Sequence, residues 1–134
     1  MQRYLGKFDD YAYSAMRIVL GFLYWSHGPS WLWGSFDGFG PVDAWSLQWV
    51  AGVLETSLGT LIAIGLFGPW AAFIACGEMA YAYFFFHIPR GSWMPIMNGS
   101  EITVALCFGF LYIATRGSGR FSIDSWLASR KADK

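Results

Sequence analysis

Four ionisable side chains stand inside long apolar stretches of the sequence, namely Arg17, Glu55, Glu78 and Glu101. On insertion scales a charged residue near the centre of a membrane helix costs about 2.5–3.5 kcal/mol, so each one needs a partner, a proton or a function. One cation cannot neutralise three carboxylates, and we therefore expect at least one glutamate to carry a proton at neutral pH. A carboxyl group that gains and releases a proton is suited to proton transfer beside a redox-active ligand.

Helical phase predicts that these groups point toward neighbouring helices. Residues spaced i, i+4, i+7 share one helix face, and small residues on that face let membrane helices approach closely. The expected inward stripes are Arg17, Gly21, Tyr24 and Gly28; Gly52, Glu55, Thr56, Gly59 and Ala63; Ala71, Ala75, Glu78 and Ala82; and Glu101, Ala105, Phe108 and Tyr112. The structural alternative is that Arg17 pairs with Glu78 or Glu55 only to hold the helices together.

Two histidines, His27 and His87, fall at the level of Glu101 at the outer ends of their apolar stretches. A shared haem or metal site is one interpretation. It is weakened because His87 is nine residues from Glu78, about half a turn out of register, and lies just before Pro89, where the helix is expected to end. We favour hydrogen bonding at the membrane interface, or a partnership with Glu101.

Other candidate residues are better explained by packing. Cys76 lies off the Glu78 stripe and Cys107 lies in another apolar stretch, so both are expected to fill the core, and no CxxC motif is present. The aromatic run over residues 81–86 is expected to be bulk that faces lipid, with the alternative that it walls a flat ring.

The composition indicates a membrane protein. The chain has 134 residues, of which 55% are hydrophobic and 13% are charged, whereas soluble domains have about 25% charged residues. Nine basic and nine acidic residues cancel, which leaves no electrostatic case for binding nucleic acid.

Four apolar stretches are each close to the length that crosses a bilayer, about 20 residues. They cover residues 10–28, 46–67, 70–88 and 99–116. The Gly- and Trp-rich segment 28–45 is expected to be an irregular loop, and Gly68 and Pro69 a tight hairpin. Ser100 is expected to cap the last helix. We therefore predict a single all-α domain over residues 1–134, built as a bundle of four transmembrane helices.

The basic residues predict the orientation, because Lys and Arg are retained on the cytoplasmic side. They gather before the first span and after the last one: Arg3, Lys7, Arg116, Arg120, Arg130, Lys131 and Lys134. The loops of the opposite face carry only Arg90. Both termini are therefore expected on the cytoplasmic side of the cell's inner (plasma) membrane. In the tail, residues 117–134, apolar and basic residues mix in a way that predicts a short helix on the membrane surface.

The sequence resembles the DoxX family of small four-helix membrane proteins over nearly its whole length. The most specific piece is the tail GSGRFSIDSWL, which begins at Gly117. Further matches are RIVLGFLYWSHG with Arg17 and His27, LETSLGTLIAIGLFGPWAA with Glu55, and EMAYAYFFFH with Glu78 and His87. Pro29, Ser30 and Trp31 depart from the basic residue that members tend to have after the HG pair.

The resemblance implies a membrane subunit of a quinone-linked redox system, of the terminal quinol oxidase or thiosulfate:quinone oxidoreductase type. Our hypothesis is that a quinone, or a similar flat apolar molecule, binds between the helices. Glu55 and Glu78 would exchange protons with it, and Arg17 would fix their charge state. His27, His87 and Glu101 would form the entrance, with Tyr24 among the ligand-binding residues.

Other functions stay open at this point. One is a non-catalytic scaffold that anchors soluble redox partners through its tail, and another is a small haem-binding electron-transfer protein. Transport is a weaker alternative, because four helices need an oligomer to enclose a path. The sequence indicates neither the electron donor nor the partner subunits, and it leaves open a homo-oligomer and whether the chain is an enzyme by itself.

Overall fold

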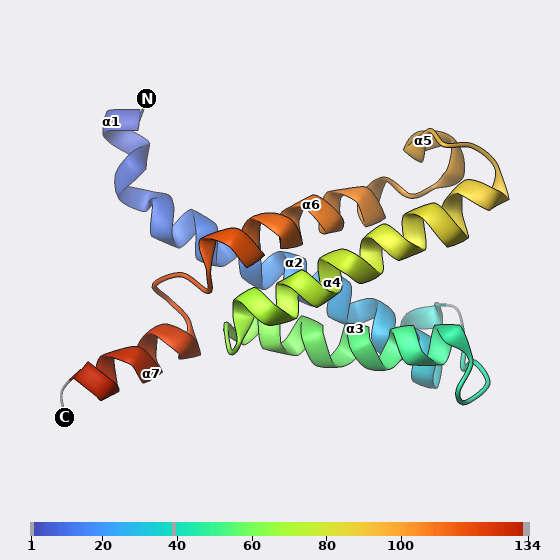
Figure 1. The fold of residues 1–134 in the computed structure, drawn as a ribbon, viewed down its shortest axis with the longest axis horizontal. Helices are drawn as coiled ribbons and strands as arrows, with labels where there is room; N and C mark the ends of the chain where they lie inside the picture. The colour runs from blue at the N-terminus through green and yellow to red at the C-terminus, as the bar shows by residue number, and fades with distance from the viewer. Residues whose placement is uncertain (1, 39, 133–134) are drawn as a thin grey trace.

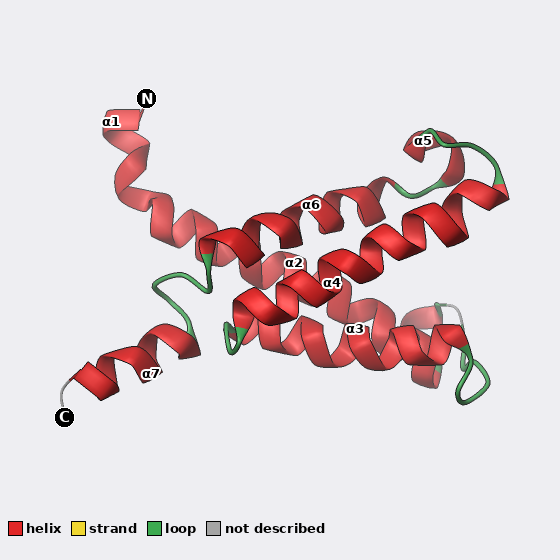
Figure 2. Cartoon of the chain, viewed as in Figure 1, coloured by secondary structure: helices red, strands yellow, loops and turns green. Residues whose placement is uncertain are grey.

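The computed structural model describes residues 2–38 and 40–132, and over these residues the chain is helical and contains no strand (Figure 2). The all-α fold class is thus confirmed. The four longest helices are α2 (Asp9–Trp33), α3 (Leu47–Ile64), α4 (Gly68–Ala82) and α6 (Glu101–Arg116). Short elements are α1 (Gln2–Leu5), the 3-10 turns Gly6–Phe8 and Ser35–Asp37, and α5 (Pro95–Asn98). α4 continues through a π turn, Tyr83–His87, and a 3-10 turn, Ile88–Arg90.

The long helices pack in two pairs, α2 against α3 and α4 against α6. Both chain ends and the α3–α4 turn lie at one end of the molecule, and the two longer connections lie at the other end (Figure 1). Successive long helices therefore alternate in direction. The predicted tail helix is present as α7, Ile123–Ala132, although Lys134 lies outside the described residues.

Two helical segments of the described chain are long and apolar enough to cross a membrane, Leu47–Ile64 and Gly68–Arg90. Only 28% and 22% of their most apolar windows are buried within the protein, so most of this apolar surface needs another apolar covering. α2 and α6 do not meet the same criterion. The 16 residues of α6 give a length of about 24 Å at 1.5 Å per residue, below the ~30 Å of a bilayer core.

The first long helix extends beyond the point that the sequence suggested. The sequence predicts an end at Gly28, but α2 continues through Pro29 and ends at Trp33, and the next residue, Gly34, has a left-handed backbone. Proline removes one backbone hydrogen bond, which is a local cost. The additional turn is held by packing, because a Cβ atom at Gly52 of α3 would lie 3.0 Å from the Cβ of Trp31.

The turn between α3 and α4 also differs in detail from the expected hairpin. α3 ends at Ile64 instead of residue 67, because Gly65 takes the left-handed conformation and donates to the carbonyls of Leu61 and Ile62. Gly68 is the first residue of α4 and does not belong to the turn. The break is therefore placed by glycine at the end of α3, as is common at helix C-termini.

Three of the four expected inward stripes are buried or half-buried in the structure. The stripe predicted for the last long helix, α6, is wrong. Glu101, Ala105, Phe108 and Tyr112 are all exposed. The buried face of α6 carries Thr103, Leu106, Phe110 and Ile113 instead. Glu101 is a poor marker of the phase of this helix, because a residue in the first turn of a helix reaches polar surroundings easily and does not report which face is buried.

Close approach of α2 and α3 leads to a first prediction, for Gly28→Ala. A Cβ atom at Gly28 would lie 2.2 Å from the hydroxyl oxygen of Thr56 and 2.6 Å from the carbonyl oxygen of Gly52. We expect the variant to lose about 1–3 kcal/mol of stability through overpacking, measured as unfolding in mixed detergent micelles. Gly77→Ala is the matched control, because no described atom lies within 4 Å of its added methyl group. Equal stability of the two variants would contradict the packing described here.

Candidate functional site

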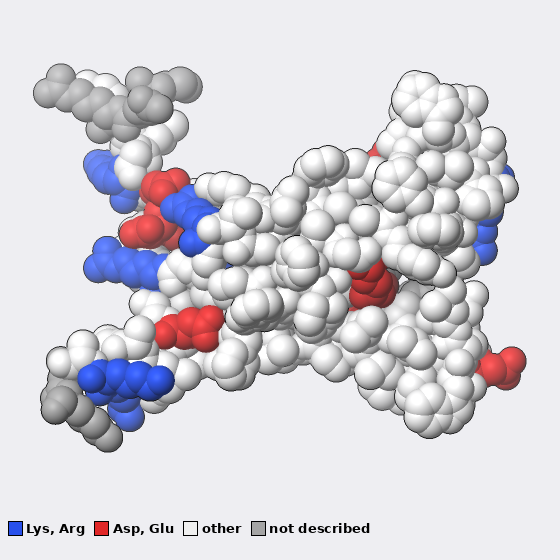
Figure 3. Space-filling model, in the orientation of Figure 1, with Lys and Arg blue, Asp and Glu red and all other residues white. Residues whose placement is uncertain are grey.

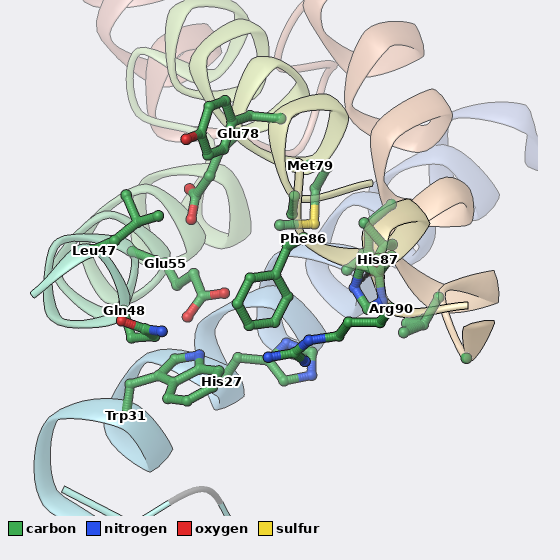
Figure 4. Close-up of a pocket in the computed structure, with 17 residues that line it drawn as sticks. His27, Trp31, Leu47, Gln48, Glu55, Glu78, Met79, Phe86, His87 and Arg90 are labelled. Carbon is green, nitrogen blue, oxygen red and sulfur yellow. Dashed lines mark hydrogen bonds between the residues drawn. The ribbon is translucent and has the colours of Figure 1, made fainter. Parts of the chain in front are cut away.

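One cavity, of about 420 Å³, lies between α2, α3, α4 and α6 near the end that holds the two longer connections. It brings together four of the predicted site residues, Glu55, Glu78, His27 and His87. Other lining residues include Trp31, Leu47, Gln48, Met79, Phe86 and Arg90. In Figure 4 the side chains of Glu55, Phe86 and His27 face a common space. Figure 3 shows acidic atoms recessed in a hollow in the otherwise uncharged middle of the molecule.

The two glutamates differ in their hydrogen bonding. Glu55 is 6% exposed, and within the described part of the chain its Oε2 atom has no hydrogen-bond partner. Glu78 accepts a hydrogen bond from the hydroxyl of Tyr24, whose ring is fully buried and packs edge-on against Phe110. Because buried polar atoms are almost always hydrogen-bonded, the Glu55 oxygen is available to a ligand or a water in the cavity.

Tyr24 therefore acts on the site through Glu78. It is absent from the residues that line the cavity, but its hydroxyl orients the Glu78 carboxylate at the cavity wall. The ring of Tyr24 lies on the buried face of α2, as the i, i+4, i+7 spacing of Arg17, Gly21 and Tyr24 predicts.

Aromatic and basic groups form the outer part of the cavity. The guanidinium of Arg90 lies 3.6 Å from the ring centroid of Phe86, a cation–π arrangement, and Arg90 extends across the cavity toward His27 (Figure 4). The Nε2 atom of His87 lies 3.3 Å from the Thr103 hydroxyl of α6. The rim of the cavity is thus basic and able to donate hydrogen bonds. The two acids, Glu55 and Glu78, lie further from this end of the molecule.

Arg17 lies elsewhere, and the structural alternative that it pairs with Glu78 or Glu55 is wrong. Its side chain is 1% exposed and donates to the carbonyl oxygens of Ile62 at 2.5 Å and Ala63 at 2.6 Å, near the end of α3. It also donates to the carbonyl of Phe121 in the tail at 2.7 Å. The last carbonyls of a helix lack intrahelical partners and carry partial negative charge, so they solvate a guanidinium as a carboxylate would.

Asp124 completes this junction between the tail and the α3–α4 turn. Its carboxylate accepts from the backbone N–H groups of Phe67 and Gly68 at 3.0 and 3.1 Å, and from the Ser118 hydroxyl at 2.5 Å. Its own N–H donates to the carbonyl of Gly65 at 3.0 Å. Partial burial alone would raise the pKa of Asp124, but the bonds from Ser118, Phe67 and Gly68 outweigh it and hold that pKa below its ordinary value.

Some of the site was not found from the sequence, and Glu101, like Arg17, lies outside it. Glu101 is exposed and is not among the described residues that line the cavity. Trp31 and Arg90 line the cavity, whereas the sequence predicts a loop at Trp31 and indicates only membrane orientation for Arg90. One feature of the sequence could have indicated Arg90 as a site residue, namely that it is the only basic residue in the outer loops. Among residues 2–38 and 40–132, no group of three or more His, Cys, Asp and Glu side chains is arranged to hold a metal.

Fold and site together define a small helical membrane protein with carboxylates facing an internal cavity. The DoxX family model matches residues 12–88, more than half of the chain. An uncharacterized protein of Haemophilus influenzae is 35% identical over 126 residues, which cover 90% of this chain and 94% of that protein. The chain belongs to the DoxX family. No solved structure matches it.

Proposed function

We propose that this protein is a quinone-binding membrane subunit of a redox system, and that its cavity holds the quinone ring. The observation that carries the proposal is the placement of Glu55 and Glu78 on one apolar cavity that aromatic side chains flank. Ligand pockets of this kind measure about 300–1,000 Å³, with a few polar groups on largely apolar walls. A volume of about 420 Å³ fits one ring with part of an isoprenoid chain.

The residues present fit such a molecule. The free Oε2 atom of Glu55 can bond to a ring oxygen when the carboxyl group is protonated, or accept from a ring hydroxyl when it is ionised. Glu78, with the Tyr24 hydroxyl behind it, is a second group that can hold or release a proton at the cavity. A bound quinone would supply two-electron, two-proton chemistry. The chain would position the ring, exclude water and store the protons.

The proposal includes a four-span topology in the inner membrane with both termini in the cytoplasm. Support comes from the charges, because Lys7, Arg116, Arg120, Arg130 and Lys131 belong to segments near the end that holds both termini, and basic side chains gather there (Figure 3). α2 and α6 would complete the bundle. Their ends carry Asp9 and Arg116, which form an ion pair and would lie at the membrane surface.

Blocking the cavity tests the proposal. Ala82 lines the cavity and Ala105 is exposed on α6. We expect Ala82→Phe to weaken the binding of a radiolabelled short-chain quinone by tenfold or more, about 1.4 kcal/mol, because the added ring occupies the space of the ligand. Ala105→Phe adds the same ring outside the cavity and should bind as the natural protein does. Saturable binding that Ala82→Phe leaves unchanged would contradict the proposed site.

A further inference from the structure

Two cysteines that are 31 positions apart in the sequence meet at the seam between α4 and α6. The sulfur atoms of Cys76 and Cys107 are 3.7 Å apart. The Cys107 sulfur is also 3.6 Å from the carbonyl oxygen of Cys76. Both thiols are free and half-buried. The sequence suggested only core packing for each of them, because neither belongs to a CxxC motif and their apolar stretches are separated by a loop.

The position of this pair suits a disulfide. α4 and α6 lie side by side along much of their length, so the two thiols are held together by the fold and need no large movement to meet. A disulfide has a sulfur–sulfur bond of about 2.05 Å. The sulfurs are already in van der Waals contact, and a side-chain rotation with a small shift of the seam brings them to bonding distance.

We propose that Cys76 and Cys107 are an oxidisable dithiol, which a hydroperoxide converts to a disulfide that joins α4 to α6. In the first step one thiol sulfur bonds to a peroxide oxygen and the O–O bond breaks. The thiol proton leaves with the alcohol or water released, and a sulfenic acid remains. In the second step the other thiol attacks that sulfur, the S–O bond breaks, and the hydroxyl group leaves as water with the second thiol proton. Two thiols are oxidised and one peroxide is reduced.

The disulfide would act on the wall of the cavity. Met79 lies one helical turn after Cys76 and Thr103 lies about one turn before Cys107, and both residues line the cavity. The contact between His87 and Thr103 bridges the same pair of helical segments. A covalent link one turn away therefore fixes the separation of the two helices at the cavity. The dithiol chemistry itself does not depend on the identity of the cavity's ligand.

The test counts free thiols in the purified full-length protein. Samples in lipid nanodiscs are treated with cumene hydroperoxide or with hydrogen peroxide, denatured and labelled with a maleimide polymer that shifts the band on a gel. We expect both labels to disappear together within one chain, with the loss of two hydrogen masses, and dithiothreitol to restore both. A faster reaction with cumene hydroperoxide would identify a lipid hydroperoxide as the source, and a faster reaction with hydrogen peroxide would identify a water-soluble one.

A matched control moves one thiol out of reach. In the double variant Cys76→Ser, Gly77→Cys, the thiol moves to an exposed position with no described atom within 4 Å, about 100° around the helix. This variant keeps two thiols and should form no internal disulfide. Cys107→Ser should accumulate a sulfenic acid that dimedone traps. The proposal is overturned if the natural pair keeps both labels, if the thiols are lost independently, or if the displaced pair crosslinks equally well.

Discussion

Replacing Glu78 with glutamine is expected to slow quinone reduction by about 10²–10⁴-fold, the usual contribution of a positioned proton donor or acceptor. Glutamine keeps the shape of the side chain and can still accept the hydrogen bond of Tyr24, but it carries no transferable proton. Glu55→Gln should have an effect of similar size, because the free oxygen of Glu55 faces the same cavity. The rate is measured in membranes from native-host cells in which the variant replaces the chromosomal copy.

The matched control for these variants is Glu101→Gln. Glu101 is the third acid of the apolar stretches, but it is exposed and does not line the cavity. Its replacement should leave the rate of quinone reduction within about twofold of the natural protein. If both cavity variants reduce quinone at the unchanged rate, the two acids have no part in proton transfer. If Glu101→Gln alone is slow, the chemistry lies outside the cavity.

Replacing Arg17 with glutamine is expected to destabilise the protein by about 3–5 kcal/mol, because it removes hydrogen bonds made by a buried guanidinium, and each bond to a charged group contributes about 1.5–3 kcal/mol. The side chain links the end of α3 to the tail through the carbonyls of Ile62, Ala63 and Phe121. A shorter, neutral amide cannot reach all three. We also expect the tail from Gly117 onward to become accessible to protease, since the same junction holds Asp124 against the N-terminus of α4.

Unfolding in mixed micelles and limited proteolysis measure these two effects. Arg120→Gln is the control, because the Arg120 side chain is 72% exposed and lies 3.9 Å from the Asp10 carboxylate, and exposed ion pairs contribute little to stability. It should unfold close to the natural protein and keep a protected tail. The same loss of stability in both variants would show that removing any cation from this end of the molecule is sufficient, contrary to the junction described here.

The sequence was informative on α2 and α3, where one helix face carries two glycines beside its polar residues. On α2, Arg17, Gly21, Tyr24 and Gly28 are all buried, as their spacing predicted. On α3, Gly52, Glu55 and Gly59 are likewise buried. These stripes are reliable because close approach of two helices requires small residues, and the polar residues beside them cannot face lipid at acceptable cost.

The contact partners of a side chain were harder to predict than the helix face on which it is buried. Arg17 was expected to find a carboxylate, since charge pairing is the simplest rule, but helix-end carbonyls and a tail carbonyl 104 positions away hold it instead. Backbone acceptors have no signature in the sequence. The meeting of Cys76 with Cys107 depends in the same way on the rotation of α6 about its axis, and that rotation was set wrongly from Glu101. Trp31 reaches the cavity only because α2 continues past Pro29.

Identifying the small molecule that co-purifies with the protein tests the central claim most directly. Mild purification followed by organic extraction and mass spectrometry is expected to find a lipophilic quinone with the natural protein and with Ala105→Phe, and none with Ala82→Phe. A natural protein that retains no quinone, or an Ala82→Phe variant that retains as much of it, would contradict a quinone site formed by Glu55, Glu78 and the aromatic walls around them.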